Sequence, residues 1–85
     1  MAKRIGVVGI VVEDKENVHR LNGILSEYAD IIIGRMGVPR HGSVNVIALI
    51  VEGSNDEVGA LTGKLGSLKG IKVRSALTNY VTGEV

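Results

Sequence analysis

The residues best suited to chemistry gather in one stretch in the middle of the chain, residues 34–43. It combines basic side chains with glycines: Arg35, Arg40, His41, Gly34, Gly37 and Gly42. Guanidinium groups bind carboxylates and phosphates through paired hydrogen bonds, and the backbone N–H groups of glycine-rich loops approach an anion closely. We therefore expect a small anionic ligand to bind at Arg35, Arg40, His41, Gly34 and Gly37. The alternative is a flexible basic loop whose glycines and Pro39 serve turn geometry.

Catalytic and metal-binding arrangements are not indicated elsewhere in the sequence. The chain contains no Cys, and His19 and His41 belong to separate predicted elements, so we expect no metal site and no cofactor. No spacing of Ser, Lys and Asp suggests a catalytic triad. An acylphosphatase would carry a basic, glycine-rich loop after the first strand, where this chain has the acidic residues 13–17. We expect a non-enzymatic protein; the alternative is a small enzyme or a metal-handling accessory protein that uses Arg35, Arg40 and His41.

The elements that position this stretch occur twice along the chain. Residues 7–13 return as residues 46–52. The next apolar positions return about 40 residues later, with Val18, Leu21, Gly23, Leu25 and Ile31 matching Val58, Leu61, Gly63, Leu65 and Ile71. Each copy predicts a strand, an amphipathic helix and a second strand. Ser54 and Glu57 have the spacing of a capping box before the second helix.

The order βαββαβ predicts an α+β fold, a ferredoxin-like sandwich with two helices on one face of a four-stranded antiparallel sheet. The first and third strands are then central. We expect a single domain over residues 1–78 and a C-terminal tail over residues 79–85. The second strand begins at Ile31 and fades into the loop of residues 34–43. The glycines of the second helix (Gly59, Gly63 and Gly66) predict close packing against the sheet.

The uncovered face of this sheet predicts self-association. An antiparallel sheet with one wet face alternates apolar and polar residues, but the first and third predicted strands are apolar at both parities. Leaving five or six such side chains in water would forgo roughly 1.5–3 kcal/mol for each. We expect a homodimer or homotetramer through the open sheet face; the alternative is a monomer that tolerates an apolar patch.

This interface is expected to be displaced toward the second strand. The repeat places Ile32 on the open face together with Lys72 and Arg74, so that the face is apolar except along the fourth strand. The candidate interface residues are Val8, Ile10, Ile32, Met36, Ile47 and Leu49. Which parity of the central strands faces the partner stays open, because both parities are equally apolar.

Charge and hydropathy place limits on location and partners. The 85 residues carry a net charge of +1, which favours neither nucleic acid nor another polyanion. Direct DNA binding is therefore not expected; a third hypothesis would place nucleic acid against Lys3, Arg4, Lys72 and Arg74. The apolar runs are too short to span a bilayer, and residues 1–4 lead into a strand without the features of a signal peptide. We expect a cytoplasmic protein without a membrane partner.

Two blocks of the chain resemble a known family. Residues 31–39 and residues 55–66, the latter continued by Gly70, Lys72 and Val73, are similar to the regulators of the iron-only hydrogenase system, small proteins of anaerobic bacteria. The resemblance covers about residues 3–78. It implies an ACT-like fold related to the ligand-sensing domain of nickel-responsive repressors. It also implies a role in regulating hydrogenase expression or maturation, as a transcriptional regulator or through a regulatory protein partner.

The chain departs from two groups of proteins with this fold. Nickel-sensing relatives bind metal through His and Cys, and this chain has neither a Cys nor a matching pair of His. Amino-acid-binding ACT domains place a Gly in the turn after the first strand, where this chain has Asn17. The sequence also contains no helix-turn-helix or ribbon-helix-helix segment. A transcriptional role would therefore require a partner protein, or a basic surface too weak to notice at a net charge of +1.

Overall fold

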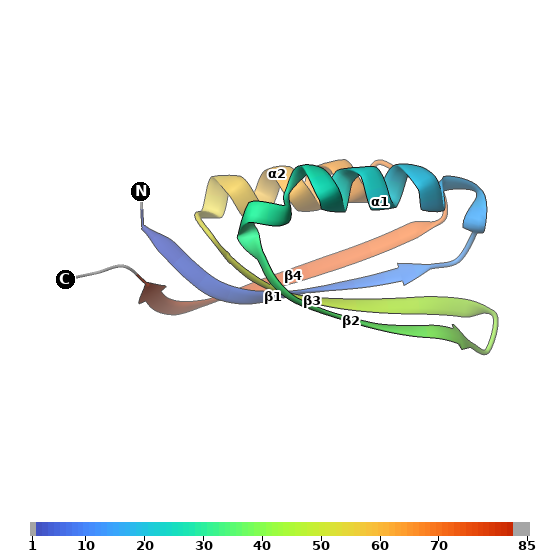
Figure 1. The fold of residues 1–85 in the computed structure, drawn as a ribbon, viewed down its shortest axis with the longest axis horizontal. Coiled ribbons are helices and arrows are strands. Elements are labelled where there is room, and N and C mark those ends of the chain that lie inside the picture. Colours follow the sequence, from blue (N-terminus) through green and yellow to red (C-terminus); the bar gives the residue numbers. More distant parts are fainter. Residues whose placement is uncertain (1, 83–85) are drawn as a thin grey trace.

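The computed structural model describes residues 2–82, apart from the side chain of Arg40. The helices pack against each other on one face of a four-stranded sheet (Figure 1). The elements are β1 (Lys3–Val12), α1 (Val18–Glu27), β2 (Ile32–His41), β3 (Val44–Gly53), α2 (Asn55–Gly66) and β4 (Ile71–Thr82), with short 3-10 turns at Lys15–Asn17 and Ala29–Ile31. The strand order is β2-β3-β1-β4, and neighbouring strands are antiparallel. The predicted ferredoxin-like sandwich with central first and third strands is confirmed.

The core lies between the sheet and the helices. Its buried side chains come from both layers: Val8, Ile10, Val12, Leu49, Val51 and Ile71 from the strands, and Leu21, Leu25, Val58, Leu61 and Leu65 from the helices. The helical members are the stripes expected from their spacing of three and four residues. Burying these aliphatic side chains stabilises the fold by about 1.5–3 kcal/mol for each, relative to leaving it exposed.

The stretch predicted as a loop is mostly strand. β2 continues to His41, and only Gly42 and Ser43 remain as the turn into β3. Gly42 has φ 66°, the left-handed conformation that a tight hairpin turn requires. Gly34 and Gly37 lie inside the ladder, opposite Ile50 and Ile47. Their local preference for turns is overridden because β3 offers a continuous row of hydrogen-bonding partners.

The C-terminal tail predicted from residue 79 is also strand as far as Thr82. β4 pairs with the beginning of β1, with Val81 opposite Arg4 and Thr82 opposite Lys3. The Thr78 hydroxyl donates a hydrogen bond to the Ile5 carbonyl at 2.6 Å. The expectation of a tail was wrong for residues 79–82, because the start of β1 supplies a ladder partner. Residues 83–85 lie outside the described part of the chain.

The glycines of α2 do not share one role. A Cβ at Gly66 would lie 3.3 Å from Val73 Cγ1, so α2 approaches β4 closely there. At Gly59 and Gly63 a Cβ would meet nothing within 4 Å, and both positions are exposed. Close packing on the sheet therefore explains Gly66 alone.

Candidate functional site

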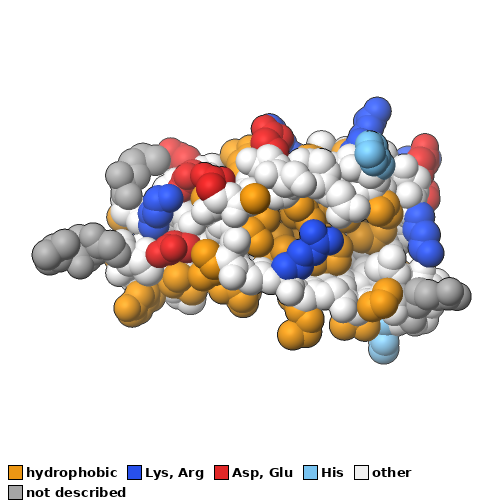
Figure 2. All heavy atoms as spheres, in the orientation of Figure 1, with side chains coloured by type: hydrophobic (Ala, Val, Ile, Leu, Met, Phe, Trp, Pro, Cys, Tyr) orange, Lys and Arg blue, Asp and Glu red, His pale blue; other side chains and the backbone are white. Residues whose placement is uncertain are grey.

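The sheet face opposite the helices, called the open face below, is apolar over three strands. The register arranges it in three rows across β2, β3, β1 and β4: Gly34, Ile50, Val7 and Ala76; Met36, Ala48, Gly9 and Arg74; Val38, Val46, Val11 and Lys72. Exposed fractions reach 49% at Val7 and 68% at Met36. Figure 2 shows hydrophobic side chains protruding along this side of the sheet. Two of the rows end in a basic side chain of β4.

The interface candidates proposed on the central strands β1 and β3 point toward the helices, not toward the open face. Val8, Ile10 and Leu49 have no exposed surface, and the half-buried Ile47 packs against the same core. Their assignment to an outward-facing interface is wrong, because the apolar stripes of α1 and α2 cover this parity. Met36 is the candidate that does lie on the open face.

Ile32 also faces the helices. It lies opposite Val51, and the register shifts between Ile32 and Gly34, which leaves Ile33 55% exposed. Ile31, the match of Ile71, belongs to the 3-10 turn rather than to the strand. The prediction that Ile32 shares the open face with Lys72 and Arg74 is wrong, because one extra residue in a strand reverses the alternation of faces.

The predicted ligand residues do not form one cluster. Arg35 lies opposite the buried Leu49, so it projects from the helix side of the sheet, where its Nη2 donates to Asn22 Oδ1 at 3.4 Å. His41 lies six residues further along β2, about 20 Å away at the rise of a strand. The side chain of Arg40 lies outside the described residues. Of the two basic candidates whose side chains are described, Arg35 lies in a hollow of the surface and His41 does not.

That hollow is part of a groove between α1 and β2, called the α1–β2 groove below. Arg35 borders two adjoining cavities of about 230 Å³ each. The first is lined by Val12, Val18, Leu21, Asn22, Arg35, Gly37, Val38, Pro39, Asn45, Val46 and Ile47. The second is lined by Leu25, Ser26, Ala29, Ile32, Arg35 and Leu49. Figure 2 shows hydrophobic side chains exposed between the helix layer and the sheet, with a basic side chain lying across them.

Sequence reasoning identified Arg35 and Gly37 but missed the contribution of α1. Asn22 stands next to Leu21, away from the apolar stripe, and nothing in the spacing indicates that it meets Arg35. The contact arises because α1 lies over the side of β3 that faces β2. The role of Asn22 can therefore be recognised only after α1 has been placed on the sheet.

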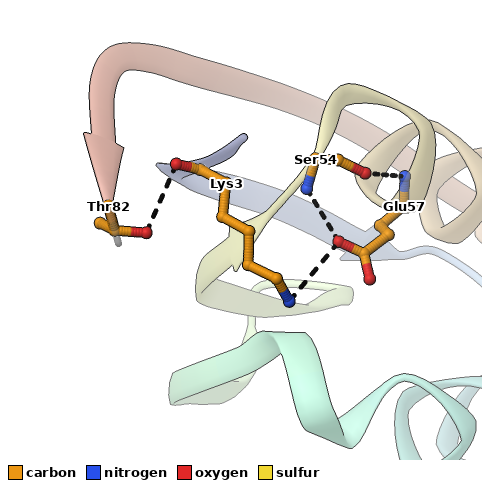
Figure 3. A network of polar contacts seen from close by, with 4 residues as sticks. All are labelled: Lys3, Ser54, Glu57 and Thr82. Carbon is orange, nitrogen blue, oxygen red and sulfur yellow. Dashed lines mark hydrogen bonds and ion pairs between the residues drawn. The ribbon is translucent and has the colours of Figure 1, made fainter. Parts of the chain in front are cut away.

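A second polar cluster is structural. At the start of α2 the Ser54 hydroxyl accepts from the Glu57 N–H at 3.1 Å, and the Ser54 N–H donates to Glu57 Oε1 at 2.9 Å. Lys3 Nζ lies 3.8 Å from the same carboxylate oxygen, and Thr82 Oγ1 donates to the Lys3 carbonyl at 3.4 Å (Figure 3). The backbone hydrogen bond from Ser54 lowers the pKa of Glu57, with a smaller contribution from Lys3. This cluster joins the start of β1 and the end of β4, which lie side by side, to the capped helix.

The helices are joined by a further exposed contact. Lys64 Nζ lies 2.8 Å from Glu27 Oε2 and 5.2 Å from the centre of the Tyr28 ring. The hydrogen bond to Glu27 raises the pKa of Lys64. Within residues 2–82, no three His, Asp or Glu side chains form a group that could hold a metal ion. No described helix has the length and apolar character needed to cross a membrane.

Comparison with known proteins identifies the family of this chain. Residues 4–75 match the family model described as "Iron-only hydrogenase system regulator, putative". Protein TM1266 from Thermotoga maritima is 38% identical, with a TM-score of 0.81 over 88% of this chain and 96% of that chain. A comparison with proteins of curated function finds no match.

More distant structures share the fold. The ACT domain of the GTP pyrophosphokinase of Chlorobium tepidum is 22% identical, with a TM-score of 0.69 over 87% of this chain and 86% of that domain. A nitrogen regulatory PII-like protein from Thiomonas intermedia, CPII, is 15% identical, with a TM-score of 0.51 over 94% and 96%. The ACT-like fold implied by the sequence is thereby confirmed. Since this family model spans most of the chain, the protein belongs to the family described as "Iron-only hydrogenase system regulator, putative".

Proposed function

We propose that this chain is a non-enzymatic, cytoplasmic regulatory module of the iron-only hydrogenase system that acts as a homo-oligomer through its open face. The family description supports the regulatory role. Regulatory proteins also occur among the structures with this fold, such as CPII, whose structure holds ADP, AMP and bicarbonate. The observation that carries the proposal is the apolar open face, since a protein that works alone has no need for one.

The composition of the open face supports a second sheet as its partner. Val7, Val38, Ile50 and Met36 each leave 41–68% of their surface in water. Covering the remainder would contribute roughly 1 kcal/mol for each side chain. Two stacked sheets interdigitate side chains of this size at a separation of about 10 Å. The charged ends of the rows at Lys72 and Arg74 would then lie at the rim of the interface.

Gly9 provides independent support. It lies in the middle of the open face, between Ala48 and Arg74, and a Cβ there would meet nothing within 4 Å. The single chain therefore does not require glycine at this position, although glycine inside a strand costs about 0.5–1 kcal/mol relative to Ala. A strand glycine often marks the close approach of another backbone, as a partner sheet would provide.

Analytical ultracentrifugation tests the assembly. The wild-type protein is expected to sediment as a dimer or tetramer at micromolar concentration, and Gly9→Lys as a folded monomer, because its ammonium group would be buried in an apolar interface. Gly63→Lys on α2 is the matched control: it introduces the same side chain at an exposed glycine with equal space and should leave the assembly unchanged. A wild-type monomer at tens of micromolar would overturn the proposal.

The regulatory role has its own test. In a host that carries the hydrogenase, deletion of this gene should change hydrogenase transcript level or activity, and Gly63→Lys should restore the wild-type level while Gly9→Lys does not. Unchanged hydrogenase output after the deletion would refute the role. No enzymatic function is proposed, because Arg35 and His41 are about 20 Å apart along β2.

A further inference from the structure

We propose that the α1–β2 groove binds a small aliphatic carboxylate. Its carboxylate pairs with the Arg35 guanidinium, and its hydrocarbon body occupies the cavity lined by Val18, Leu21 and Ile47. This inference rests on the proposed regulatory function, to which it adds the chemical class of the signal.

The placement of Arg35 is the first argument. Its register position lies on the face of the sheet that elsewhere carries the apolar core, opposite Leu49. The hydrogen bond that Arg35 donates to the neutral amide of Asn22 is long, at 3.4 Å. The ion pairs among the described residues are Lys3–Glu57 and Lys64–Glu27, so Arg35 has no carboxylate partner there. A guanidinium fork of this kind matches a carboxylate through two parallel hydrogen bonds.

The shape of the groove limits the size of the ligand. Each cavity beside Arg35 measures about 230 Å³, slightly below the range of roughly 300–1,000 Å³ typical of drug-sized ligands. A nucleotide would exceed one cavity, whereas a carboxylic acid of five or six carbons would fit. The aliphatic part of the first cavity comes from side chains such as Val18 and Leu21 of α1 and Ile47 of β3, and the neutral amides of Asn22 and Asn45 complete its lining.

The charge of the groove selects a carboxylate over a phosphate. Arg35 is the one basic residue among the described residues that line the two cavities, which matches the single negative charge of a carboxylate. Gly34 and Gly37 are paired within the β2–β3 ladder, so they do not form the concave row of N–H groups that cradles a phosphate. A dianion would find no second cation among these residues, because the other polar side chains of the lining, Asn22, Asn45 and Ser26, are neutral.

A different role for Arg35 makes a distinct prediction. β2 is an edge strand, and charged residues that point inward from an edge strand oppose edge-to-edge aggregation. In that role Arg35 needs no ligand, and its replacement would promote aggregation without affecting any binding. Titration of the intact protein separates the two roles.

The probe is 4-methylpentanoate, titrated into ¹⁵N-labelled protein at millimolar concentration, with the neutral 4-methylpentanamide and inorganic phosphate as comparisons. Saturable shifts are expected at the amides of Leu21, Asn22, Gly37 and Ile47 with the carboxylate. The neutral amide and the Arg35→Gln variant should each weaken binding by about tenfold or more. Arg20→Gln, which removes the same charge from an exposed position on α1, should bind like the wild type.

Gly37→Leu provides a second variant in case Arg35→Gln aggregates. Its Cβ would meet nothing within 4 Å, while the side chain would fill the first cavity, so binding should be lost in a protein that stays folded. Absence of saturable shifts with 4-methylpentanoate would overturn the proposal. Arg35 would then be assigned the alternative role of opposing aggregation at the edge strand β2. Equal shifts with phosphate would overturn the choice of an aliphatic carboxylate.

The Gly9→Lys variant distinguishes failure of this inference from failure of the proposed function. The groove is built within one chain, so a monomeric Gly9→Lys protein should bind 4-methylpentanoate as tightly as the wild type. Loss of groove binding in a protein that still assembles would refute only the ligand site. Groove binding by a wild-type monomer would refute only the assembly.

Discussion

The two halves of the molecule share one plan but differ in how the helix covers its second strand. In the second half, α2 approaches β4 so closely that a Cβ at Gly66 would lie 3.3 Å from Val73. In the first half, α1 leaves β2 partly uncovered, and the α1–β2 groove opens between them. The repeat places Ser75 and Leu77 at the positions of Arg35 and Gly37. The second half, in which helix and strand come close at Gly66, is called the closed half below, and the first half, which carries the proposed binding site, the open half. A hollow of about 580 Å³ also borders Gly66 and Val73, together with Lys72 and Arg74.

The two helices also differ in how their first turns are capped. α2 begins with a complete capping box between Ser54 and Glu57. At the start of α1 the side chain of Asn17 makes no capping bond; its amide instead donates to the Lys69 carbonyl at 3.0 Å. The beginning of α1 is thus fixed by the other half of the molecule. We infer that α1 and β2 form the more adaptable half, where a ligand can act at the smallest cost in stability.

The largest expected effect is a difference between matched leucines in the two helices. Leu61 of α2 has no exposed surface, while Leu21 of α1 is buried but lines the groove. Leu61→Ala should lower the free energy of unfolding by about 3–5 kcal/mol, and Leu21→Ala by about 2–3 kcal/mol, because a site beside an open groove leaves less empty volume behind. Urea denaturation of the two variants measures the difference.

The comparison has a matched control in Leu25→Ala and Leu65→Ala, the next pair of the repeat. The expected order is the same, since Leu25 borders the second cavity and Leu65 is fully buried. If both pairs showed equal losses within error, the two halves would be equally well packed. The distinction between an open and a closed half would then be wrong.

Most of the fold was predictable because its determinants are local. The stripes of Leu21 and Leu25, and of Leu61 and Leu65, follow from helical spacing alone. The capping-box spacing of Ser54 and Glu57 predicts the start of α2 from four consecutive residues. The outward positions of Lys72 and Arg74 follow from alternation along one strand. None of these features depends on a distant part of the chain.

The errors arose where distant contacts decide the structure. Gly34, Gly37 and Pro39 favour a loop locally, but hydrogen bonding to β3 extends the strand. The exposed position of Ile33 depends on a shift of register that no single-strand pattern reveals. On β1 both parities are aliphatic, so periodicity could not tell Val7 from Val8. Only the placement of the helices decides which of them is buried.

For the same reason, the residue type at the candidate site was predictable but its surroundings were not. Arg35 could be proposed as an anion ligand from its residue type. Its separation from His41 follows from the strand conformation, and its contact with Asn22 from the placement of α1. The sequence could therefore indicate the chemistry of the site, whereas its walls depended on tertiary packing.

An intermediate effect is expected at the capped helix. Ser54→Ala should lower the free energy of unfolding by about 1–2 kcal/mol, because it removes the hydroxyl that accepts from the Glu57 N–H. Asn17→Ala at the start of α1 should cost less than about 1 kcal/mol, since its bond to Lys69 is exposed. Thermal and urea unfolding of both variants measure this asymmetry, and a larger loss at Asn17 would contradict it.

The same helix start predicts a dependence on pH. The folded state lowers the pKa of Glu57, chiefly through the Ser54 N–H, so the unfolded state binds the proton more tightly. The stabilisation from this group is complete above the ordinary pKa of Glu, about 4.3, and is lost as the pH falls through the lower folded pKa. Between pH 5 and pH 3, Glu57→Gln should lose less stability than the wild type. Asp56→Asn, which removes an acid from the same turn without altering the Ser54 bonds, should retain the wild-type slope.

The smallest expected effect is a gain in stability on closing the open half. Gly37→Leu gives β2 the residue that β4 carries at Leu77, which is half-buried and packs against the core. Space is available, and removal of a strand glycine stabilises by about 0.5–1 kcal/mol. The urea midpoint should rise while the slope of the transition stays constant. A fall in stability would mean that the groove is not free to accept a side chain, and therefore that it cannot hold an aliphatic ligand of similar size.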